Sequence, residues 1–482
     1  MAGQPDRAGD AQREEGGQTR RRRAGIGHAA ERRTVEPRAA VKPTQPGGPG
    51  AISAGDSYLP QHGNGGYRIT RYELDLGYRV AANRLTGRVL ISAFATQTLT
   101  RFSLDLANLT VSKVLVNGRR AAKFVVRGRK LNITPEQPIP IGTALLVDIA
   151  YSGNPGPLRG PWGDVGWEEL ADGVLVAGQP NGAPSWFPCN DHPGEKASYQ
   201  FTVTTDSPYL VVANGTLVRR QVRAAQTTWV FDQPEPMATY LATLHIGQYE
   251  MLDFAKTPVR QRVAVPPRLR NLARIDLGRQ AEMMVAFQTM FGPYPFGQYT
   301  VVVTDDNLEI PLEAQGLSVF GANFLDGRRG QERLVAHELA HQWFGNSLTV
   351  AGWRHIWLNE GFACYAEWLW SEASGGATAA VHATRAWNRL AALPQNLVIS
   401  DPGPALMFDD RLYKRGALTL HALRGLVGDI VFFTLVREWV AVHRHGSVTT
   451  AEFVELAARH SAAPVRELLS RWLDQPGLPP LV

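Results

Sequence analysis

Two histidines one helical turn apart, followed by a glutamate, constrain this sequence more than any other feature. His337 and His341 enclose Glu338 in the pattern His-Glu-Leu-Ala-His, and Glu360 follows in an Asn-Glu-Gly context. Each residue of an α-helix turns by about 100°, so both imidazoles point to the same side. Two imidazoles and one carboxylate form a donor set typical of catalytic zinc, with a fourth position left open. The sequence therefore predicts a zinc site made by His337, His341 and Glu360.

Glu338 lies beside the first predicted ligand and is not needed to hold the metal. A carboxylate in this position can take a proton from a water at the open position, so we expect Glu338 to be the general base. The alternative is an amphipathic helix that carries two histidines by coincidence. The five-residue pattern would arise by chance in roughly one or two chains per hundred of this length, and the downstream glutamate lowers that fraction. The metal site is therefore the favoured interpretation.

The segments around these residues are predicted to be helical. Residues 332–344 contain no Gly or Pro and precede Gly345, which suits a helix C-cap. A second helix is predicted over residues 359–374, with Asn359 as its N-cap. Glu367 lies two turns into that helix, where it could hydrogen-bond a ligand imidazole as a second-shell partner. A solvated glutamate is equally compatible with this spacing.

These motifs resemble those of the gluzincin zinc metallopeptidases, the family of aminopeptidase N and leukotriene hydrolase. Residues 337–344 are similar to the zinc helix of that family, and residues 357–362 are similar to its third-ligand segment. Residues 186–193 resemble a substrate-side loop of its N-terminal domain. The resemblance covers roughly residue 56 to the C-terminus. It implies one Zn²⁺ per chain, peptide substrates, and removal of N-terminal residues from them.

The resemblance also implies roles for three further residues. Tyr413 precedes a Lys-Arg-Gly-Ala sequence and matches a tyrosine that donates to the oxyanion of the tetrahedral intermediate, although alone it would more often be a packed helix residue. Glu313 matches the glutamate that binds the substrate's α-amine. Pro311 and Ala314 depart from the family's Gly-x-Met-Glu-Asn loop, and Pro311 has no N–H to offer a substrate. Gln179 matches a Glu or Gln that contacts the same amine, with an ordinary loop glutamine as the alternative.

Three functions stay open at this point. The favoured one is a zinc-dependent aminopeptidase. The altered loop around Glu313 also permits a zinc endopeptidase with a relaxed requirement for a free N-terminus. The third is a zinc-binding interaction protein without turnover. The presence of Glu338 and Tyr413 disfavours this last function, because metal binding alone requires neither residue.

The hydrophobic pattern predicts an α+β chain. Apolar and polar residues alternate over residues 72–80, as in a half-buried strand, and helical periodicity begins near Leu269. With the resemblance, this implies a β-rich, saddle-like N-terminal domain at 56–247 and a mainly helical, thermolysin-like catalytic domain at 248–482. Larger relatives of the family carry a C-terminal helical-repeat domain. Too few residues follow Tyr413 for such a domain, so the leaving-group side of the cleft is expected to be open and indifferent to the peptide's C-terminus.

Residues 1–55 are predicted to be a disordered basic tail. They are rich in Gly, Pro and Arg and nearly lack large apolar side chains, so they cannot bury a core. They contain ten Lys and Arg against six Asp and Glu, and thus hold +4 of the chain's net charge of +6. The rest of the chain is too weakly basic to indicate nucleic-acid binding. The arginines at 20–23 could contact an acidic surface, although a solvated run is the favoured interpretation.

No signal peptide or transmembrane segment is recognised in the sequence. The apolar stretch after residue 23 is short and interrupted by glycines, and no segment reaches the ~20 apolar residues of a membrane span. Only two cysteines, Cys189 and Cys364, are present, which suits a reducing compartment. Cys189 and His192 are a poor candidate for a second metal pair. We therefore expect a cytoplasmic location without membrane or nucleic-acid partners.

Overall fold

The computed structural model describes residues 47–481. Most of the predicted tail, including the arginines at 20–23, lies outside the described residues. The last part of the predicted tail nevertheless belongs to the fold, since β1 (Gly48–Pro49) pairs in parallel with β4 (Leu99–Asp105). Backbone hydrogen bonds from Gly50 N to Arg101 O at 2.8 Å and from Gly65 N to Ala51 O at 2.9 Å hold this segment. Such bonds need no large side chains, so composition could not indicate them.

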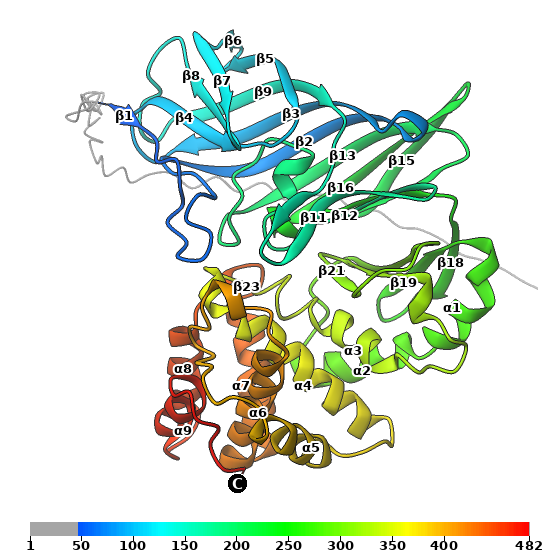
Figure 1. Cartoon of the computed structure of the whole chain (residues 1–482), viewed down its shortest axis with the longest axis vertical. Helices are drawn as coiled ribbons and strands as arrows, with labels where there is room; N and C mark the ends of the chain where they lie inside the picture. Colours follow the sequence, from blue (N-terminus) through cyan, green and yellow to red (C-terminus); the bar gives the residue numbers. More distant parts are fainter. Residues whose placement is uncertain (1–46, 482) are drawn as a thin grey trace, which may run out of the picture. The chain divides into compact units, whose positions relative to one another are not determined.

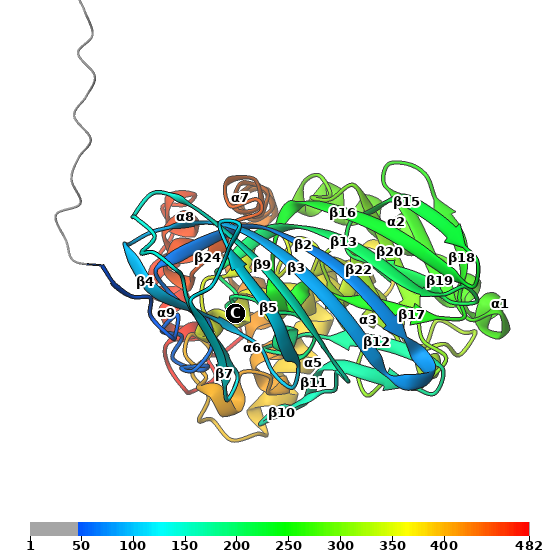
Figure 2. The same cartoon turned by 90° about the horizontal axis from the view of Figure 1, so that it is seen from above.

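An eight-stranded sheet dominates the first half of the described chain (Figure 1, Figure 2). Its order is β15-β16-β13-β2-β3-β9-β5-β6. Burial alternates along β2, as predicted, because successive side chains of a strand point to opposite faces. The strands are β2 (Tyr67–Arg79), β3 (Arg84–Ala95), β5 (Thr110–Val116), β6 (Arg119–Arg120), β9 (Ala144–Gly153), β13 (Lys196–Asp206), β15 (Thr216–Arg223) and β16 (Gln226–Ala238).

Two smaller sheets complete this β-rich half. One has the order β1-β4-β8-β7 and the other the order β10-β11-β12-β17-β14. Their remaining strands are β7 (Lys123–Arg127), β8 (Lys130–Thr134), β10 (Leu158–Gly160), β11 (Gly163–Leu170), β12 (Gly173–Ala177), β14 (Leu210–Ala213) and β17 (Leu244–Gly247).

The aromatic residues of the segment at 186–193 lie in the core of this half. Trp186 and Phe187 are fully buried, and their rings are 4.6 Å apart. Trp186 also stacks on Phe201 of β13 at 6.3 Å. The expectation of a substrate-side loop is therefore wrong for these two side chains, which stabilise the β-rich domain by burying aromatic surface.

A new sheet begins after Gly247, with the order β18-β19-β20-β22-β21. This change of sheet lies near residue 248, and the domain boundary at that position stays a prediction from sequence. The sheet contains β18 (Glu250–Ala255), β19 (Arg260–Val265), β20 (Gln298–Val303), β21 (Leu312–Ala314) and β22 (Leu317–Phe320). The helices are α1 (Arg270–Asp276), α2 (Gln280–Phe291), α3 (Glu332–Ala340), α4 (Trp357–Ala373), α5 (Ala379–Ala391), α6 (Asp410–Val427), α7 (Asp429–Val442), α8 (Thr450–Arg459) and α9 (Val465–Leu473).

The prediction of an α+β chain, with a β-rich domain followed by a mainly helical domain, is confirmed. Among residues 47–481, no helical-repeat domain follows α9. None of the helices in this range combines the length and the apolar character needed to cross a lipid bilayer.

Lys196 of β13 connects the β-rich half to the helical half. Its Nζ donates hydrogen bonds to the carbonyl oxygens of Asn346 at 3.1 Å, Ser347 at 2.8 Å and Gly446 at 3.2 Å. Asn346 and Ser347 follow α3, and Gly446 precedes β24 (Ser447–Val448), which pairs with β23 (Thr349–Val350). Burial lowers the pKa of Lys196 to about 7. This side chain therefore positions the loop that follows the two histidines.

Arg415 of α6 hydrogen-bonds to the segment that follows α9. Its side chain is buried, and its hydrogen-bond partners within the described part of the chain are backbone carbonyls and not carboxylates. The guanidinium donates to backbone carbonyl oxygens of Leu397 at 3.1 Å, Trp472 at 2.9 Å, Pro476 at 2.6 Å and Gly477 at 3.0 Å, and also to that of Gln475.

We expect Arg415→Met to lower the free energy of unfolding by about 3 kcal/mol. Each buried carbonyl left without a donor costs roughly 1–3 kcal/mol, but some of these carbonyls will hydrogen-bond to water instead, which reduces the total cost. Urea unfolding followed by tryptophan fluorescence measures this loss. The exposed Arg459, at the end of α8, provides the control variant Arg459→Met. Equal unfolding midpoints for both variants would contradict the role given to Arg415.

Candidate active site

The two histidines lie at the C-terminal end of α3. His337 and Glu338 are within the helix, and His341 is the first residue after it. The helix predicted to reach residue 344 is therefore shorter than expected. After Ala340 the backbone tightens, with Trp343 N bonded to Ala340 O at 3.0 Å. Gly345 has φ +121° and lies in the loop that follows, so it does not cap the helix as predicted.

The second helix begins earlier than predicted. α4 starts at Trp357, and Ile356 is its N-cap residue without a side-chain capping bond. The short 3-10 helix Trp353–His355 leads directly into α4 and supplies its first turn. Asn359 is consequently inside the helix and buried, and the prediction of Asn359 as N-cap is wrong. Glu360 lies in the first turn of α4.

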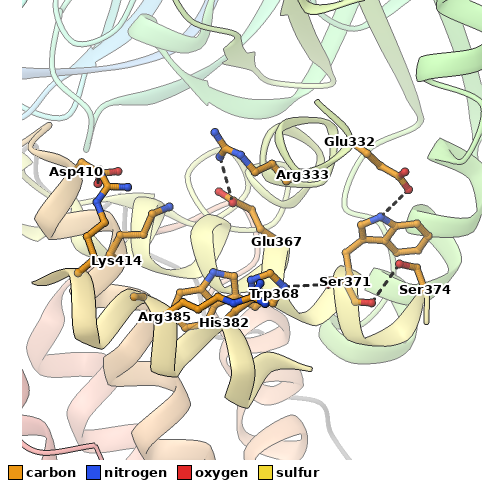
Figure 3. A pocket seen from close by; sticks show the side chains of 13 residues that line it. Glu332, Arg333, Glu367, Trp368, Ser371, Ser374, His382, Arg385, Asp410 and Lys414 are labelled. Atoms are coloured by element: carbon orange, nitrogen blue, oxygen red, sulfur yellow. Dashed lines mark hydrogen bonds and ion pairs between the residues drawn. The ribbon is translucent and has the colours of Figure 1, made fainter. Parts of the chain in front are cut away.

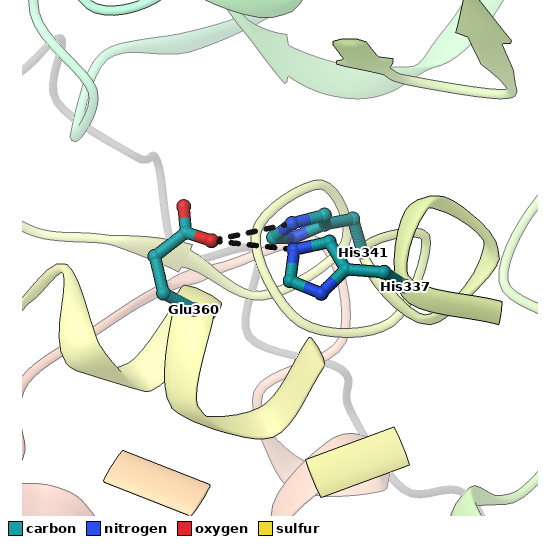
Figure 4. Close-up of side chains that lie close together, drawn as sticks. All are labelled: His337, His341 and Glu360. Atoms are coloured by element: carbon teal, nitrogen blue, oxygen red, sulfur yellow. Dashed lines mark ion pairs between the residues drawn. The ribbon is translucent and has the colours of Figure 1, made fainter. Parts of the chain in front are cut away.

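The two imidazoles converge on one carboxylate oxygen. Glu360 Oε2 is 3.6 Å from His337 Nε2 and 3.5 Å from His341 Nε2, as Figure 4 shows. Ligand atoms around a tetrahedral zinc with bonds of about 2.0–2.1 Å are separated by roughly 3.3–3.4 Å. All three donor atoms lie within 4.8 Å of one another and are buried. The donor set therefore fits one Zn²⁺ in both chemistry and spacing.

The other ring nitrogen of each histidine is held by a fixed acceptor. Glu367 Oε1 lies 2.8 Å from His337 Nδ1, and the Phe344 carbonyl oxygen lies 3.0 Å from His341 Nδ1. With Nδ1–H donating to these acceptors, Nε2 of each ring is free to bind a metal. Arg333 in turn donates to Glu367 Oε2 at 3.3 Å. The role of the Phe344 carbonyl could not be predicted, because every residue offers a carbonyl. The only signal for Arg333 in the sequence is its place one turn before His337.

Mutual charge interactions shift the pKa values of this cluster. Burial alone would raise the pKa of Glu360, but the neighbouring His341 and His337 lower it to about 2. Burial would lower the pKa of His337, but its hydrogen bonds to Glu360 and Glu367 raise it to about 9. The two imidazoles thus keep Glu360 ionised, as a metal ligand must be, and a bound metal would take the place of the added proton on His337.

Glu338 has a different environment from Glu360. Its Oε2 is buried and has no hydrogen-bond partner among the described residues. Burial is the main cause that raises the pKa of Glu338 to about 7, although the two histidines oppose the shift. A carboxyl group with a pKa near neutrality can both accept and return a proton at working pH.

Glu313 and Gln179 lie together beside the cluster. Gln179 Nε2 donates to Glu313 Oε1 at 2.7 Å. Glu313, on β21 at the edge of its sheet, offers an oxygen within 4.8 Å of donor atoms of Glu338 and His341. Burial, with a contribution from Glu360 and against the effect of His341, raises the pKa of Glu313. A cationic amine bound beside Glu313 would lower the pKa of this carboxyl again, because a positive charge favours the ionised carboxylate.

The departures from the family loop leave β21 as a regular strand. Glu313 pairs with Ser318 of β22 in antiparallel register. The Ala314 carbonyl oxygen accepts hydrogen bonds from Gln342 Nε2 at 3.2 Å and Asn346 Nδ2 at 2.9 Å. These residues follow His341, so side chains beyond the zinc helix anchor the strand that carries Glu313.

Tyr413 lies near the start of α6 and reaches the same cluster. Its ring is 6.1 Å from the His337 ring, with an angle of 17° between the planes. Burial, together with the carboxylates of Glu360 and Glu313, raises its pKa well above the ordinary value. The phenol therefore stays protonated and can donate a hydrogen bond.

A glycine contact sets the distance between α4 and α6. A Cβ added to Gly361 would lie 2.9 Å from the Gly416 Cα, and one added to Gly416 would lie 2.8 Å from the Gly361 Cα. The backbones therefore touch where no side chain fits. Gly361 follows Glu360 and Gly416 is three residues beyond Tyr413, so this contact positions both candidate site residues.

We expect Gly416→Ala to push α4 away from α6 and to lower both zinc affinity and turnover by roughly tenfold or more, since displaced supporting groups typically cost 10–100-fold. Competition with a fluorescent chelator measures zinc affinity, and initial rates measure turnover. Gly425→Ala is the matched control, because it lies in the same helix and a Cβ there meets no atom within 4 Å. Equal zinc affinity and turnover in the two variants would contradict this role of the contact.

The chain matches two domains that are characteristic of one protein family. Residues 276–472 match the Peptidase family M1 domain, and residues 69–241 match the Peptidase M1 N-terminal domain. The first match contains the histidine–glutamate cluster with Glu313 and Tyr413, and the second contains Gln179.

Named relatives include several aminopeptidases. Aminopeptidase M1-B of Oryza sativa subsp. japonica is 26% identical over 313 residues, which are 61% of this chain and 36% of that protein. Leucine aminopeptidase 2 of Coccidioides immitis is 25% identical over 454 residues, which are 86% of this chain and 72% of that protein. The chain thus spans about a third of the rice relative.

Solved structures of similar proteins share the fold. A variant of the M1 zinc metallopeptidase from Deinococcus radiodurans, bound to a Tyr-Ser-Ala substrate, is 31% identical with a TM-score of 0.82, and the match covers 89% of this chain and 99% of that one. Native yeast LTA4 hydrolase is 21% identical with a TM-score of 0.73, covering 86% of this chain and 69% of that one. The second likeness concerns the fold alone.

Proposed function

Since the chain belongs to the M1 peptidase family, we propose that it is a zinc-dependent aminopeptidase that removes N-terminal residues from peptides. The observation that carries this proposal is the convergence of His337 and His341 on Glu360, with the Glu313 carboxylate beside them. The first three residues are the proposed zinc ligands. Glu313 is the proposed site for the substrate ammonium.

Each remaining residue has a proposed task. The chemistry that zinc supplies when bound is Lewis acidity, which polarises the scissile carbonyl and lowers the pKa of a water. Glu338 takes the proton of the attacking water and passes it to the leaving amine. Tyr413 donates its hydroxyl proton as a hydrogen bond to the developing oxyanion. Glu367 orients His337 and maintains its tautomer.

The pairing of Gln179 with Glu313 supports exopeptidase action. The Gln179 amide donates to the Glu313 carboxylate at 2.7 Å, and this carboxylate lies close to Glu338 and His341. There the Glu313 carboxylate forms a charge-assisted contact with the free α-amine of a bound peptide. An endopeptidase would have no use for a carboxylate here and stays the alternative. A zinc-binding protein without turnover is the second alternative.

Peptides are the proposed partners. A cytoplasmic location, the absence of nucleic-acid and membrane partners, and any contact made by the arginines at 20–23 stay predictions from sequence.

Hydrolysis of a panel of fluorogenic aminoacyl amides tests the proposed function. We expect cleavage of at least one member, loss of the rate after treatment with a zinc chelator, and recovery when zinc is returned. Absence of cleavage across the panel, with zinc bound to the protein, would favour the interaction protein. A rate that does not respond to the chelator would exclude a zinc-dependent reaction.

A further inference from the structure

The three proposed zinc ligands lie on both sides of one connecting segment. His337 and His341 precede this segment, and Glu360 follows it in the first turn of α4. The segment consists of residues 342–356 and is named the connector here. Its path decides how far the two imidazoles lie from the Glu360 carboxylate. Groups that hold the connector therefore influence the geometry of the metal site.

One support of the site comes from within the helical half. Glu367 of α4 contacts His337 Nδ1 at 2.8 Å and accepts a hydrogen bond from Arg333, as Figure 3 shows for the second pair. Both Arg333 and Glu367 line a cavity of about 550 Å³ that α3, α4, α5 and α6 share. This pair orients His337 and joins α3 to α4, but it lies outside the connector.

The β-rich half holds the first part of the connector through Lys196. The three N–H groups of its ammonium are matched by three carbonyl oxygens, those of Asn346 at 3.1 Å, Ser347 at 2.8 Å and Gly446 at 3.2 Å. The first two belong to the connector. Gly446 directly precedes β24, which pairs with β23 inside the connector. One lysine thus uses its full donor capacity on this segment and on the strand beside it.

Asn346 connects Lys196 to the site. Its backbone N–H donates to the His341 carbonyl oxygen at 3.0 Å, and its Nδ2 donates to the Ala314 carbonyl oxygen at 2.9 Å. Ala314 directly follows Glu313 on β21. Lys196 is therefore one residue removed from a proposed zinc ligand and from the strand that carries the proposed amine site.

Asp56 holds the last part of the connector, also from the β-rich half. Its Oδ2 accepts a hydrogen bond from Trp353 N at 2.9 Å, and its Oδ1 accepts from the backbone N–H groups of Tyr58 at 2.8 Å and Leu59 at 3.0 Å. Trp353 begins the 3-10 helix that runs into α4, and the first N–H groups of a helix have no acceptor within it. Asp56 is buried and supplies that acceptor two turns before Glu360.

We propose that Lys196 and Asp56 are positioning residues for the metal site, which hold the two ends of the connector so that His341 and Glu360 stay at zinc-binding distance. The charges suit their partners, because an ammonium favours carbonyl oxygens and a carboxylate favours N–H groups. The β-rich half thus sets the separation of ligands that all belong to the helical half. This inference rests on the proposed zinc ligands, and hence on the proposed function.

Two substitutions of similar size remove these contacts. Lys196→Met keeps the length of the side chain but has no donor, and Asp56→Asn replaces one accepting oxygen with an NH₂ donor. We expect each variant to bind zinc roughly 10–100-fold more weakly, the usual cost of losing a group that supports a metal ligand. Competition with a fluorescent chelator measures the dissociation constant. Lys196→Arg restores donors to the carbonyls and should recover part of the affinity.

Trp162→Phe provides the matched control. Trp162 Nε1 donates to the Pro404 carbonyl oxygen at 2.8 Å, which is another hydrogen bond between the two halves. Neither residue belongs to the connector, so this variant should bind zinc as tightly as the unchanged protein. Urea unfolding of every variant records any loss of stability.

Cobalt separates positioning from stability. The visible absorption of bound Co²⁺ depends on the arrangement of its ligands. At saturating Co²⁺ we expect an altered spectrum for Lys196→Met and for Asp56→Asn, and an unchanged spectrum for Trp162→Phe. A loss of stability alone would leave the spectrum of the fully loaded protein unchanged.

Equal zinc affinity in the control and in the connector variants overturns the positioning role, while the zinc peptidase stands. Weaker zinc binding with an unchanged cobalt spectrum also overturns it, because lower stability then explains the effect. If Lys196→Met does not fold, Lys196→Arg and Asp56→Asn provide the same comparison.

The proposed function fails in other ways. Absence of zinc binding by the unchanged protein overturns the proposed function and this inference together. Zinc binding with the expected variant effects, but without hydrolysis of any aminoacyl amide, overturns the peptidase alone and supports the positioning role.

Discussion

Glu338→Gln is expected to retain about one zinc ion per chain while its turnover falls by roughly 10²–10⁴-fold, the usual contribution of a general base. The reason is that Glu338 is not among the three converging donors, and its Oε2 has no other partner among the described residues. Glu360→Ala removes a donor and should lose the metal itself. Metal content by mass spectrometry and initial rates, measured on the same samples, separate the two effects.

A surface glutamate provides the control for this experiment. Glu282 of α2 is exposed and remote from the cluster, so Glu282→Gln should change neither zinc content nor rate. A fully active Glu338→Gln protein would contradict the assignment of the base. Loss of zinc from Glu338→Gln alone would instead place Glu338 among the ligands.

Glu313→Gln is expected to lower kcat/KM for peptides with a free N-terminus by roughly a hundredfold, which corresponds to about 3 kcal/mol of transition-state binding. The substitution keeps the shape of the side chain and removes the charge that faces the substrate ammonium. Steady-state kinetics on one unblocked peptide measures the loss. Gln179→Ala should cost less, because Gln179 carries no charge and acts by holding Glu313.

A zinc determination on the same Glu313→Gln protein provides the control, since Glu313 is not a proposed ligand and the metal should stay bound. An unchanged kcat/KM in zinc-loaded Glu313→Gln would contradict amine recognition by this carboxylate.

Local patterns in the sequence were sufficient to predict much of the fold. The alternation of β2 and the helical period after Leu269 depend on side-chain burial, which repeats every second or every third to fourth residue. The pairing of β1 with β4 and the first turn of α4 could not be predicted. Both depend on backbone hydrogen bonds and on a preceding 3-10 turn, which leave no periodic signal.

The residues proposed to bind zinc could be predicted because spacing on a helix places His337 and His341 together. The contacts that hold these residues in place could not be predicted, because they join segments that are far apart in the chain. The contact of Gly361 with Gly416 is one example, and the cavity shared by α3, α4, α5 and α6 is another. Resemblance to a family indicated Glu313 and Tyr413, which no local pattern would have selected.

The direct test of an aminopeptidase is the response to a blocked N-terminus. One peptide is incubated with the zinc-loaded protein in its free and its N-acetylated form, and the products are identified by mass spectrometry. We predict stepwise loss of N-terminal residues from the free peptide and no cleavage of the acetylated one, because acetylation removes the cation that Glu313 binds. Efficient internal cleavage of the acetylated peptide would contradict the account and identify an endopeptidase.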